Sequence, residues 1–223
     1  MQIVAEFVTS AAGAGDFPRD RLPEIALVGR SNVGKSSLIN ALTRQRIART
    51  SAAPGKTRLA NVYRIRRGGN PPFHLVDLPG YGFARALRQA QGTAAPTFDD
   101  IARAVFDRRP AALLLVDARH PGLTNDLASW TWVRAAACEA AIVATKIDKL
   151  ARGERIRAMR ELESVFQVPV LPCSAVTGEG LDDLWKLIDR LLTRSSNHPR
   201  PRSLPPKATA QPAARHRFRR PKS

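Results

Sequence analysis

Residues 29–36 have the residue types and the spacing of a phosphate-binding loop. Two glycines flank four residues, and Lys35 and Ser36 follow the second glycine directly. In such a loop the backbone N–H groups converge on phosphate oxygens, helped by the positive end of the helix that follows. The lysine reaches the β- and γ-phosphates, and the serine hydroxyl binds Mg²⁺. The pattern predicts a nucleoside triphosphate site formed by one run of residues: Gly29, Arg30, Ser31, Asn32, Val33, Gly34, Lys35, Ser36 and Ser37.

Two further segments offer the groups that such a site needs around the metal and the γ-phosphate. Asp77 ends a predicted strand, so its carboxylate can hold a water on Mg²⁺, while the Gly80 N–H can contact the γ-phosphate. Thr57 can complete the Mg²⁺ shell only when the γ-phosphate is present, and losing that contact on hydrolysis would release its loop. These segments add eight candidate contacts: Pro54, Gly55, Lys56, Thr57, Asp77, Leu78, Pro79 and Gly80. The predicted catalytic residues are Lys35, Thr57 and Gly80, and the predicted Mg²⁺ ligands are Ser36, Thr57 and, through a water, Asp77.

Two later strand ends carry the groups that would select a guanine base. The Asp148 carboxylate can accept from both N1–H and the 2-amino group, two donors that adenine does not present together, and the Lys146 stem can cover the base. The Ala175 N–H, after the last predicted strand, can meet guanine O6. The predicted base contacts are Thr145, Lys146, Ile147, Asp148, Cys173, Ser174 and Ala175. Each later motif alone is a common turn or surface pattern, but their coincidence at strand ends predicts guanine nucleotide binding.

Short apolar strands alternate with helical patterns along the chain, and this alternation predicts how the motifs are positioned. Strands are expected at 24–28, 60–66, 73–77, 111–117, 141–145 and 168–172, and helices at 35–42, 98–107, 124–137, 153–166 and 181–192. The pattern predicts an α/β fold, a three-layer αβα sandwich around a mostly parallel six-stranded sheet, with one antiparallel strand from a hairpin. We expect an N-terminal extension over 1–22, a nucleotide-binding domain over 23–192 and a disordered basic tail over 193–223.

The chain is strongly basic, and much of its charge lies at one end. Its 223 residues include 36 Lys and Arg against 19 Asp and Glu, a formal net charge of +17, and residues 193–223 hold nine basic and no acidic residues. Such a balance indicates a polyanionic partner: nucleic acid is the leading candidate and an acidic membrane surface is the second. No apolar run has the roughly 20 residues of a membrane span, and the N-terminus lacks the regions of an export signal. We therefore expect a soluble cytoplasmic monomer without membrane association, in which Cys138 and Cys173 are packing residues.

Together these segments resemble the EngB family of Era-like GTPases, also called YsxC or YihA. The resemblance is carried by residues 23–42, 48–57, 76–84, 117–121 and 145–149, where Thr145 in place of the usual Asn is common in that family. It spans about residues 7–192 and leaves out the tail. It implies GTP and Mg²⁺ binding, hydrolysis of GTP to GDP, and a switch role in assembling the bacterial large ribosomal subunit and its rRNA, on which normal division depends. The site residues it implies are Asn32, Gly34, Lys35, Ser36, Thr57, Asp77, Gly80, Lys146, Asp148 and Ser174.

Hydrolysis is expected to be slow without help. Tyr81 stands where Ras-like proteins have the residue that orients the attacking water, and a phenol is a poor substitute. Either a partner or a monovalent cation would raise the rate. Related Era-like GTPases hold K⁺ with an asparagine at the position of Asn32, which makes Asn32 a candidate K⁺ ligand, or else a brace of the loop. Tyr81, with Arg85 and Arg88, predicts an RNA-binding surface or a solvated loop, and residues 215–220 predict an RNA-binding arm or a solubilising tail.

Other functions stay open on the sequence alone. The positive charge also fits a basic RNA-binding or RNA-chaperone protein whose nucleotide site is regulatory or vestigial, and absence of Mg²⁺-dependent turnover would favour it. Another Era-like role would require a further folded domain or a membrane segment, for which the residues after 192 leave no room. An ATP-dependent kinase would not need Asp148, so the base preference of an Asp148 variant separates the two enzymes.

Overall fold

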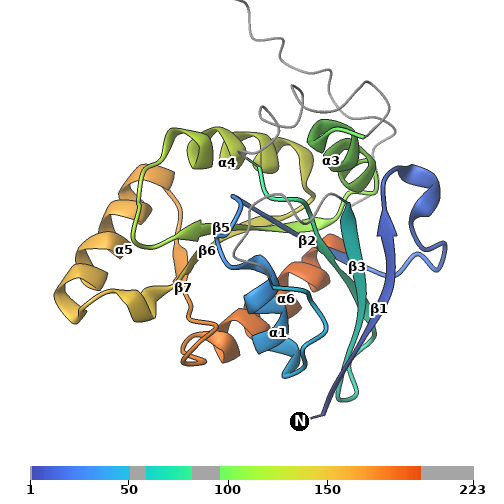
Figure 1. The fold of residues 1–223 in the computed structure, drawn as a ribbon, viewed down its shortest axis with the longest axis horizontal. Helices are drawn as coiled ribbons and strands as arrows, with labels where there is room; N and C mark the ends of the chain where they lie inside the picture. Colours follow the sequence, from blue (N-terminus) through green and yellow to red (C-terminus); the bar gives the residue numbers. More distant parts are fainter. Residues whose placement is uncertain (1, 51–58, 82–95, 197–223) are drawn as a thin grey trace, which may run out of the picture.

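A seven-stranded sheet runs through the molecule in the order β1-β3-β4-β2-β5-β6-β7 (Figure 1). The computed structural model describes residues 2–50, 59–81 and 96–196. The strands are β1 (Ile3–Ala11), β2 (Glu24–Gly29), β3 (Ala60–Arg67), β4 (Phe73–Asp77), β5 (Ala111–Asp117), β6 (Ala140–Thr145) and β7 (Val170–Pro172). The helices are α1 (Lys35–Thr43), α3 (Phe98–Phe106), α4 (Thr124–Ala136), α5 (Arg152–Phe166) and α6 (Leu181–Ser196), with short 3₁₀ helices η1 (Ala14–Asp16) and η2 (Ile147–Lys149).

One strand of the sheet runs against the others. β3 is antiparallel to both of its neighbours, β1 and β4, while β4, β2, β5, β6 and β7 are parallel to one another. The predicted mostly parallel sheet with one antiparallel strand is therefore confirmed. The carboxyl ends of the parallel strands meet at one edge, where α/β proteins of this kind bind their ligands.

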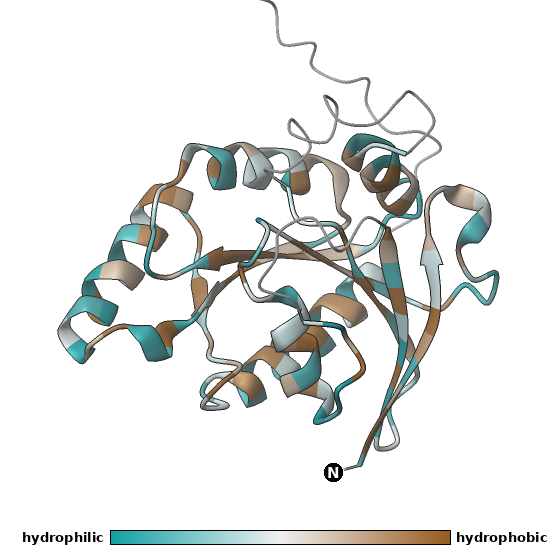
Figure 2. Ribbon diagram, viewed as in Figure 1, coloured by the Kyte–Doolittle hydropathy of each residue, from teal (hydrophilic) through white to brown (hydrophobic). Residues whose placement is uncertain are grey.

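Helices cover both faces of the sheet, as the predicted three-layer sandwich requires (Figure 1). Successive residues of β2 show the division: Ala26 and Val28 belong to the core under α3, α4 and α5, whereas Ile25 and Leu27 belong to the core under α1 and α6. Side chains alternate along a strand, so a strand buried on both faces must be apolar throughout. Figure 2 shows the central strands coloured as hydrophobic along most of their length.

The sequence-based strand count was wrong by one. β1 lies within the stretch 1–22 that was expected to be an extension, and it pairs with β3 along its whole length with one irregularity between Phe7 and Thr9. Its sequence is only partly apolar and most of its side chains are exposed, so its strand character depends on its pairing with β3, about fifty residues or more along the chain. The helix expected to end at Leu192 continues to Ser196. The other predicted strands and helices lie within two residues of the observed bounds.

Candidate nucleotide site

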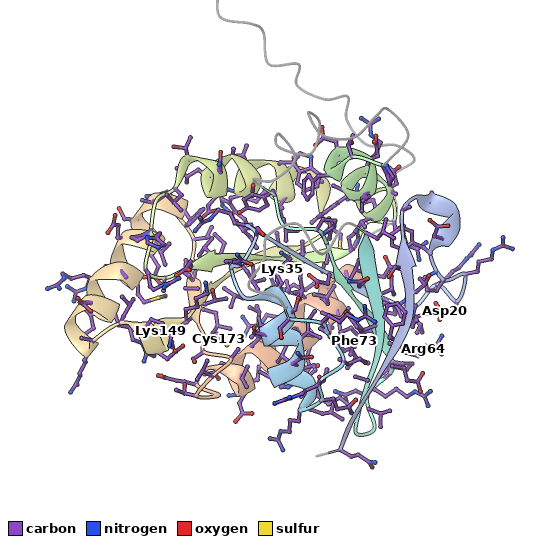
Figure 3. All side chains as sticks on the ribbon, viewed as in Figure 1. Asp20, Lys35, Arg64, Phe73, Lys149 and Cys173 are labelled. Carbon is purple, nitrogen blue, oxygen red and sulfur yellow. The ribbon has the colours of Figure 1, made fainter. Side chains whose placement is uncertain are left out.

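The predicted site residues that the structure describes gather at the carboxyl edge of the sheet. Gly29 ends β2, Asp77 ends β4 and Thr145 ends β6, while Lys35 is the first residue of α1 and Cys173 follows β7. Figure 3 shows where Lys35 and Cys173 lie on this framework. Pro54, Gly55, Lys56 and Thr57 lie outside the described residues, as do Arg85, Arg88 and the arm over 215–220.

Close packing and backbone conformation fix the loop between β2 and α1. A methyl group on Gly29 would lie 2.9 Å from the Leu115 carbonyl oxygen, so the chain can pass there only as glycine. Gly34, the residue before α1, has φ +111°, a left-handed conformation that glycine adopts without a steric penalty. The Val33 N–H donates to the Arg30 carbonyl at 3.2 Å. The turn leaves α1 beginning at Lys35, with the free N–H groups of its first turn at the loop.

Lys35 and Asp77 are two buried ionisable groups beneath this loop. The Lys35 ammonium donates to the carbonyls of Gly29 at 3.2 Å and Arg30 at 3.5 Å. Burial lowers the pKa of Lys35, an effect that the charge of Asp77 opposes. Burial raises the pKa of Asp77 to about 6, against the influence of Lys35 and of Ser36. Two groups that each cost free energy to bury are thus held where a phosphate and a cation would stabilise them.

The residues around Asp77 fit a bound Mg²⁺. The Ser36 hydroxyl donates to Asp77 Oδ2 at 3.3 Å, whereas Asp77 Oδ1 is buried and has no hydrogen-bond partner among the described residues. Mg²⁺ prefers oxygen ligands and usually keeps several waters, so one hydroxyl and one carboxylate suffice when phosphate oxygens complete the shell. Within the described ranges there is no cluster of three or more His, Cys, Asp or Glu that could hold a metal ion by itself.

The structure corrects the expectation for Tyr81. Both alternatives for the aromatic and basic segment placed this side chain at the surface, yet Tyr81 is only 9% exposed. Its ring packs edge-on to Phe98 at 6.5 Å, and its hydroxyl donates to Asp126 Oδ1 at 2.7 Å. Its backbone lies against the phosphate-binding loop, since Tyr81 N–H donates to the Gly29 carbonyl and the Ser31 N–H donates to the Tyr81 carbonyl, both at 3.3 Å. Tyr81 therefore belongs to the core.

The predicted base-binding residues lie beside the same loop. The Thr145 hydroxyl donates to the Val33 carbonyl at 2.7 Å and lies 3.1 Å from the Val116 carbonyl. The Lys146 ammonium donates to the Asn32 carbonyl at 2.6 Å. These contacts attach the segment after β6 to the loop before α1, so the predicted base and phosphate contacts share one support.

Asp148 is held from the segment that follows β7. The Ser174 hydroxyl donates to Asp148 Oδ1 at 2.7 Å, and it accepts from the N–H groups of Val176 and Thr177 at 3.2 and 3.1 Å. Ser174 is fully buried, and Ala175 beside it is half-buried. Asp148 is thereby oriented through one oxygen, and the other lies 3.7 Å from the Lys149 ammonium.

Sequence reasoning missed Asp117, which ends β5. Its carboxylate accepts from the Lys146 ammonium at 2.9 Å and from Arg119 Nε and Nη2 at 2.9 and 2.7 Å. Burial alone would raise the pKa of Asp117, but the hydrogen bonds from Arg119 and Lys146 outweigh it and hold that pKa well below its usual range. The signal was present in the sequence, because Asp117 closes an apolar strand next to the strand that ends at Thr145.

Comparisons with known proteins agree with this geometry. The family model described as "50S ribosome-binding GTPase" matches residues 24–146. The chain is 41% identical over 190 residues to a probable GTP-binding protein EngB of Heliobacterium modesticaldum, covering 83% of this chain and 90% of the relative. It is 39% identical over 191 residues to the protein of the same description from Thermotoga maritima, covering 84% and 95%.

Solved structures show the same fold. A variant of Era from Aquifex aeolicus, bound to GDP·AlF₄⁻, superposes with a TM-score of 0.64 at 23% identity, covering 76% of this chain and 56% of Era. A crystal structure of a probable GTP-binding protein EngB gives a TM-score of 0.56 at 22% identity, covering 76% of this chain and 98% of the other.

Among the described residues, no helix is both long and apolar enough to span a membrane.

Proposed function

This chain belongs to the EngB family of GTP-binding proteins, and on that premise we propose that it binds GTP with Mg²⁺ at this sheet edge and hydrolyses it to GDP. The observation that carries the proposal is the junction of Lys35, Ser36 and Asp77 beneath the glycine-rich loop. A buried ammonium, a hydroxyl and a carboxylate with one oxygen that no described residue contacts by a hydrogen bond supply what a magnesium–phosphate group requires.

Each residue of the junction has a distinct task in the proposed reaction. Lys35 exchanges its two carbonyl acceptors for phosphate oxygens and neutralises charge that grows between the β- and γ-phosphates in the transition state. Ser36 binds Mg²⁺ directly and Asp77 binds it through a water; the ion supplies further neutralisation of the phosphate oxygens. The Gly80 N–H and the Thr57 hydroxyl are the remaining groups that we assign to the γ-phosphate and the metal.

The base site rests on Asp148 and Lys146. Because the Ser174 hydroxyl donates to one carboxylate oxygen of Asp148, that carboxylate is oriented before the nucleotide binds. The Lys146 side chain is held at the Asn32 carbonyl and at Asp117, so its stem is set beside the loop that takes the phosphates. Pre-ordering of this kind lowers the entropic cost of binding.

The wild-type protein should hydrolyse GTP slowly in a Mg²⁺-dependent manner, and Lys35→Ala should abolish measurable nucleotide binding. Single-turnover release of phosphate at saturating enzyme, with and without EDTA, tests the first statement. Fluorescence titration with a labelled GDP tests the second. Turnover that survives EDTA, or Lys35→Ala binding GDP as the wild type does, would contradict the assignment.

Asn32 is our candidate for a K⁺ ligand that raises the rate. It is an exposed residue of the phosphate-binding loop with φ +60°, two residues before Gly34, which places it near the phosphates of a nucleotide bound at this loop. Single-turnover rates in KCl should exceed those in NaCl at equal ionic strength, and Asn32→Ala should remove the difference. Equal rates in both salts would leave Asn32 only the role of bracing the loop.

For the cellular role, we propose a switch that visits the large ribosomal subunit during its assembly. The description of the matching family model and the formal net charge of +17 support this role. Tagged full-length protein loaded with a non-hydrolysable GTP analogue should co-sediment with large-subunit particles, whereas the GDP-loaded protein should not. A second form ending at Ser196, where α6 ends, separates the contribution of residues 197–223.

The same experiment tests the alternative of a basic RNA-binding protein. That alternative would be favoured if the protein co-sediments equally with GDP and with the GTP analogue, and if removing residues 197–223 abolishes the co-sedimentation. A salt series sharpens the distinction, because binding through phosphate contacts alone weakens steeply as counterions compete. The switch would be favoured if the protein stays bound to large-subunit particles at moderate salt only when it is loaded with the GTP analogue.

A further inference from the structure

Asp126, near the start of α4, is a buried carboxylate outside every predicted motif. Its side chain is 2% exposed, and two groups converge on one of its oxygens. The Tyr81 hydroxyl donates to Oδ1 at 2.7 Å, and Arg30 Nε lies 3.2 Å from the same atom. Burying a carboxylate is costly unless it is paired, so this contact is a specific one.

The two groups that meet at Asp126 come from the two segments that flank the proposed γ-phosphate position. Arg30 is the second residue of the phosphate-binding loop, and Tyr81 follows Gly80 directly. Their backbones are already paired, as a bridge between Arg30 and Tyr81 and the two 3.3 Å hydrogen bonds show. Asp126 therefore adds a third, side-chain link to a junction that the backbone forms.

The junction leaves little freedom at Gly80. A methyl group on Gly80 would lie 2.6 Å from both Cα and N of Ser31, so the two segments are in direct backbone contact there. The ring of Tyr81 extends from this contact into the core, where it meets Phe98. With its ring packed and its hydroxyl bonded, Tyr81 fixes where the neighbouring Gly80 N–H lies.

We propose that Asp126 is a positioning residue for GTP hydrolysis, acting through Tyr81 and Arg30. The inference rests on the proposed function. Asp126 itself touches neither phosphate nor metal in this role; it sets the alignment of Gly80 with the loop at Ser31. Hydrolysis depends on donors held in place before the reaction, and misplacing them by an ångström costs much of the rate.

Three variants test the role. Tyr81→Phe keeps the ring and removes the hydroxyl. Asp126→Leu keeps the approximate shape and removes both the charge and the acceptor oxygens. The third variant combines both changes. Each single variant should lower the single-turnover rate constant for GTP hydrolysis about tenfold, the expected order for losing a hydrogen bond to a charged group. The Kd for GDP should change less than about threefold, because no base or β-phosphate contact is touched. The double variant should be no slower than the slower single variant, because both changes break one link.

Thr131→Ala is the matched control on the same helix. Its exposed hydroxyl bonds only to the Leu127 carbonyl among the described groups, so the rate should stay at the wild-type value. Single variants with wild-type rates, additive losses in the double variant, or a loss of GDP affinity equal to the loss of rate would overturn the proposal. A wild-type protein without Mg²⁺-dependent turnover would instead overturn the proposed function, and this inference with it.

Discussion

The Thr145 hydroxyl donates to the Val33 carbonyl at 2.7 Å and joins two segments that are 112 residues apart in the sequence. Thr145 closes β6 and Val33 lies in the loop before α1, so one short side chain connects the base-binding and phosphate-binding parts of the proposed site. The same hydroxyl lies 3.1 Å from the Val116 carbonyl of β5. A hydroxyl has one proton to donate, so these two carbonyls share it.

Replacing Thr145 with valine should therefore loosen both segments at once. The variant keeps the shape but leaves two buried carbonyls without this donor, which we expect to cost about 1–3 kcal/mol of unfolding free energy. The Kd for GDP should rise as well. Urea denaturation and fluorescence titration measure the two effects, and Thr145→Ser, which keeps the hydroxyl, is the control. Equal stability of the valine and serine variants would show that the hydrogen bond is unimportant.

Asp148→Asn should change which base is bound. The asparagine side chain can still accept from the Ser174 hydroxyl, so the loop keeps its support, but one acceptor for the guanine donors becomes an N–H. GTP affinity should fall about a hundredfold or more, since an unpaired polar group in a specific site is heavily penalised. Xanthosine triphosphate should bind better than to the wild type. Competition titrations with both nucleotides measure this change in base preference. Asp183→Asn, at an exposed position, is the control. Unchanged GTP affinity would refute the base assignment.

Gly80→Ala should damage both stability and turnover. The added methyl group would lie 2.6 Å from the Ser31 backbone, and relieving that contact means separating the two segments. Overpacking of this kind costs about 1–3 kcal/mol, and the rate of GTP hydrolysis should fall more than tenfold. Gly153→Ala is an apt control, because nothing lies within 4 Å of its added methyl group and alanine favours its helix. That variant should be slightly stabilised and fully active.

Glu24 should control acid stability without affecting catalysis. It lies at the start of β2, where Arg108 Nε donates to its two oxygens at 2.9 and 3.0 Å. Burial alone would raise the pKa of Glu24, but the His74 ring, whose Nδ1 lies 3.9 Å from Glu24 Oε1, and the Arg108 guanidinium outweigh it, and the pKa lies below its ordinary value of 4.5. A lowered pKa means that the ionised group stabilises the fold above about pH 4.5, and this stabilisation is lost as the pH falls through the folded-state value.

The variant Glu24→Gln isolates this effect. At pH 7 its free energy of unfolding should be about 2 kcal/mol lower than that of the wild type. This loss is smaller than for a fully buried ion pair, because the Arg108 side chain is 26% exposed. Its stability should then decline less steeply than that of the wild type between pH 5 and pH 3, in urea titrations across that range. GTP hydrolysis at pH 7 should be unchanged, since Glu24 is at the opposite end of β2 from Gly29. Parallel acid profiles for the two proteins would contradict the role.

The sequence pattern predicted the strands and helices whose own apolar spacing matches the structure that they adopt in the fold. β4 and β5 lie where their apolar runs predicted, and α5 begins one residue before its expected start. Asp77 and Thr145 follow from the same logic, because parallel strands place their carboxyl ends at one edge.

The features that sequence could not supply all depend on partners far along the chain. Tyr81 is held in the core by its hydrogen bond to Asp126, which lies 45 residues later in α4. The residues next to Tyr81 in the sequence do not predict that contact. The sequence places Asp117 at a strand end, but it does not show the contact of this carboxylate with Lys146, 29 residues later. β1 is a strand because β3 pairs with it. In each case the side chain's neighbours, and not its type, determine what it does.

The pairing of β1 with β3 has a practical consequence for handling the protein. Ser10 pairs with Asn61, and Asn61 pairs with Asp77, so the end of β1 is two strands across from the carboxylate that we assign to Mg²⁺. Ile3, at the other end of β1, pairs with Arg67, about 25 Å further along the strand. An affinity handle on the Ile3 side of β1 should therefore not interfere with nucleotide binding, whereas trimming the first eleven residues would remove the strand that pairs with β3, the neighbour of β4 and of the proposed Mg²⁺ site.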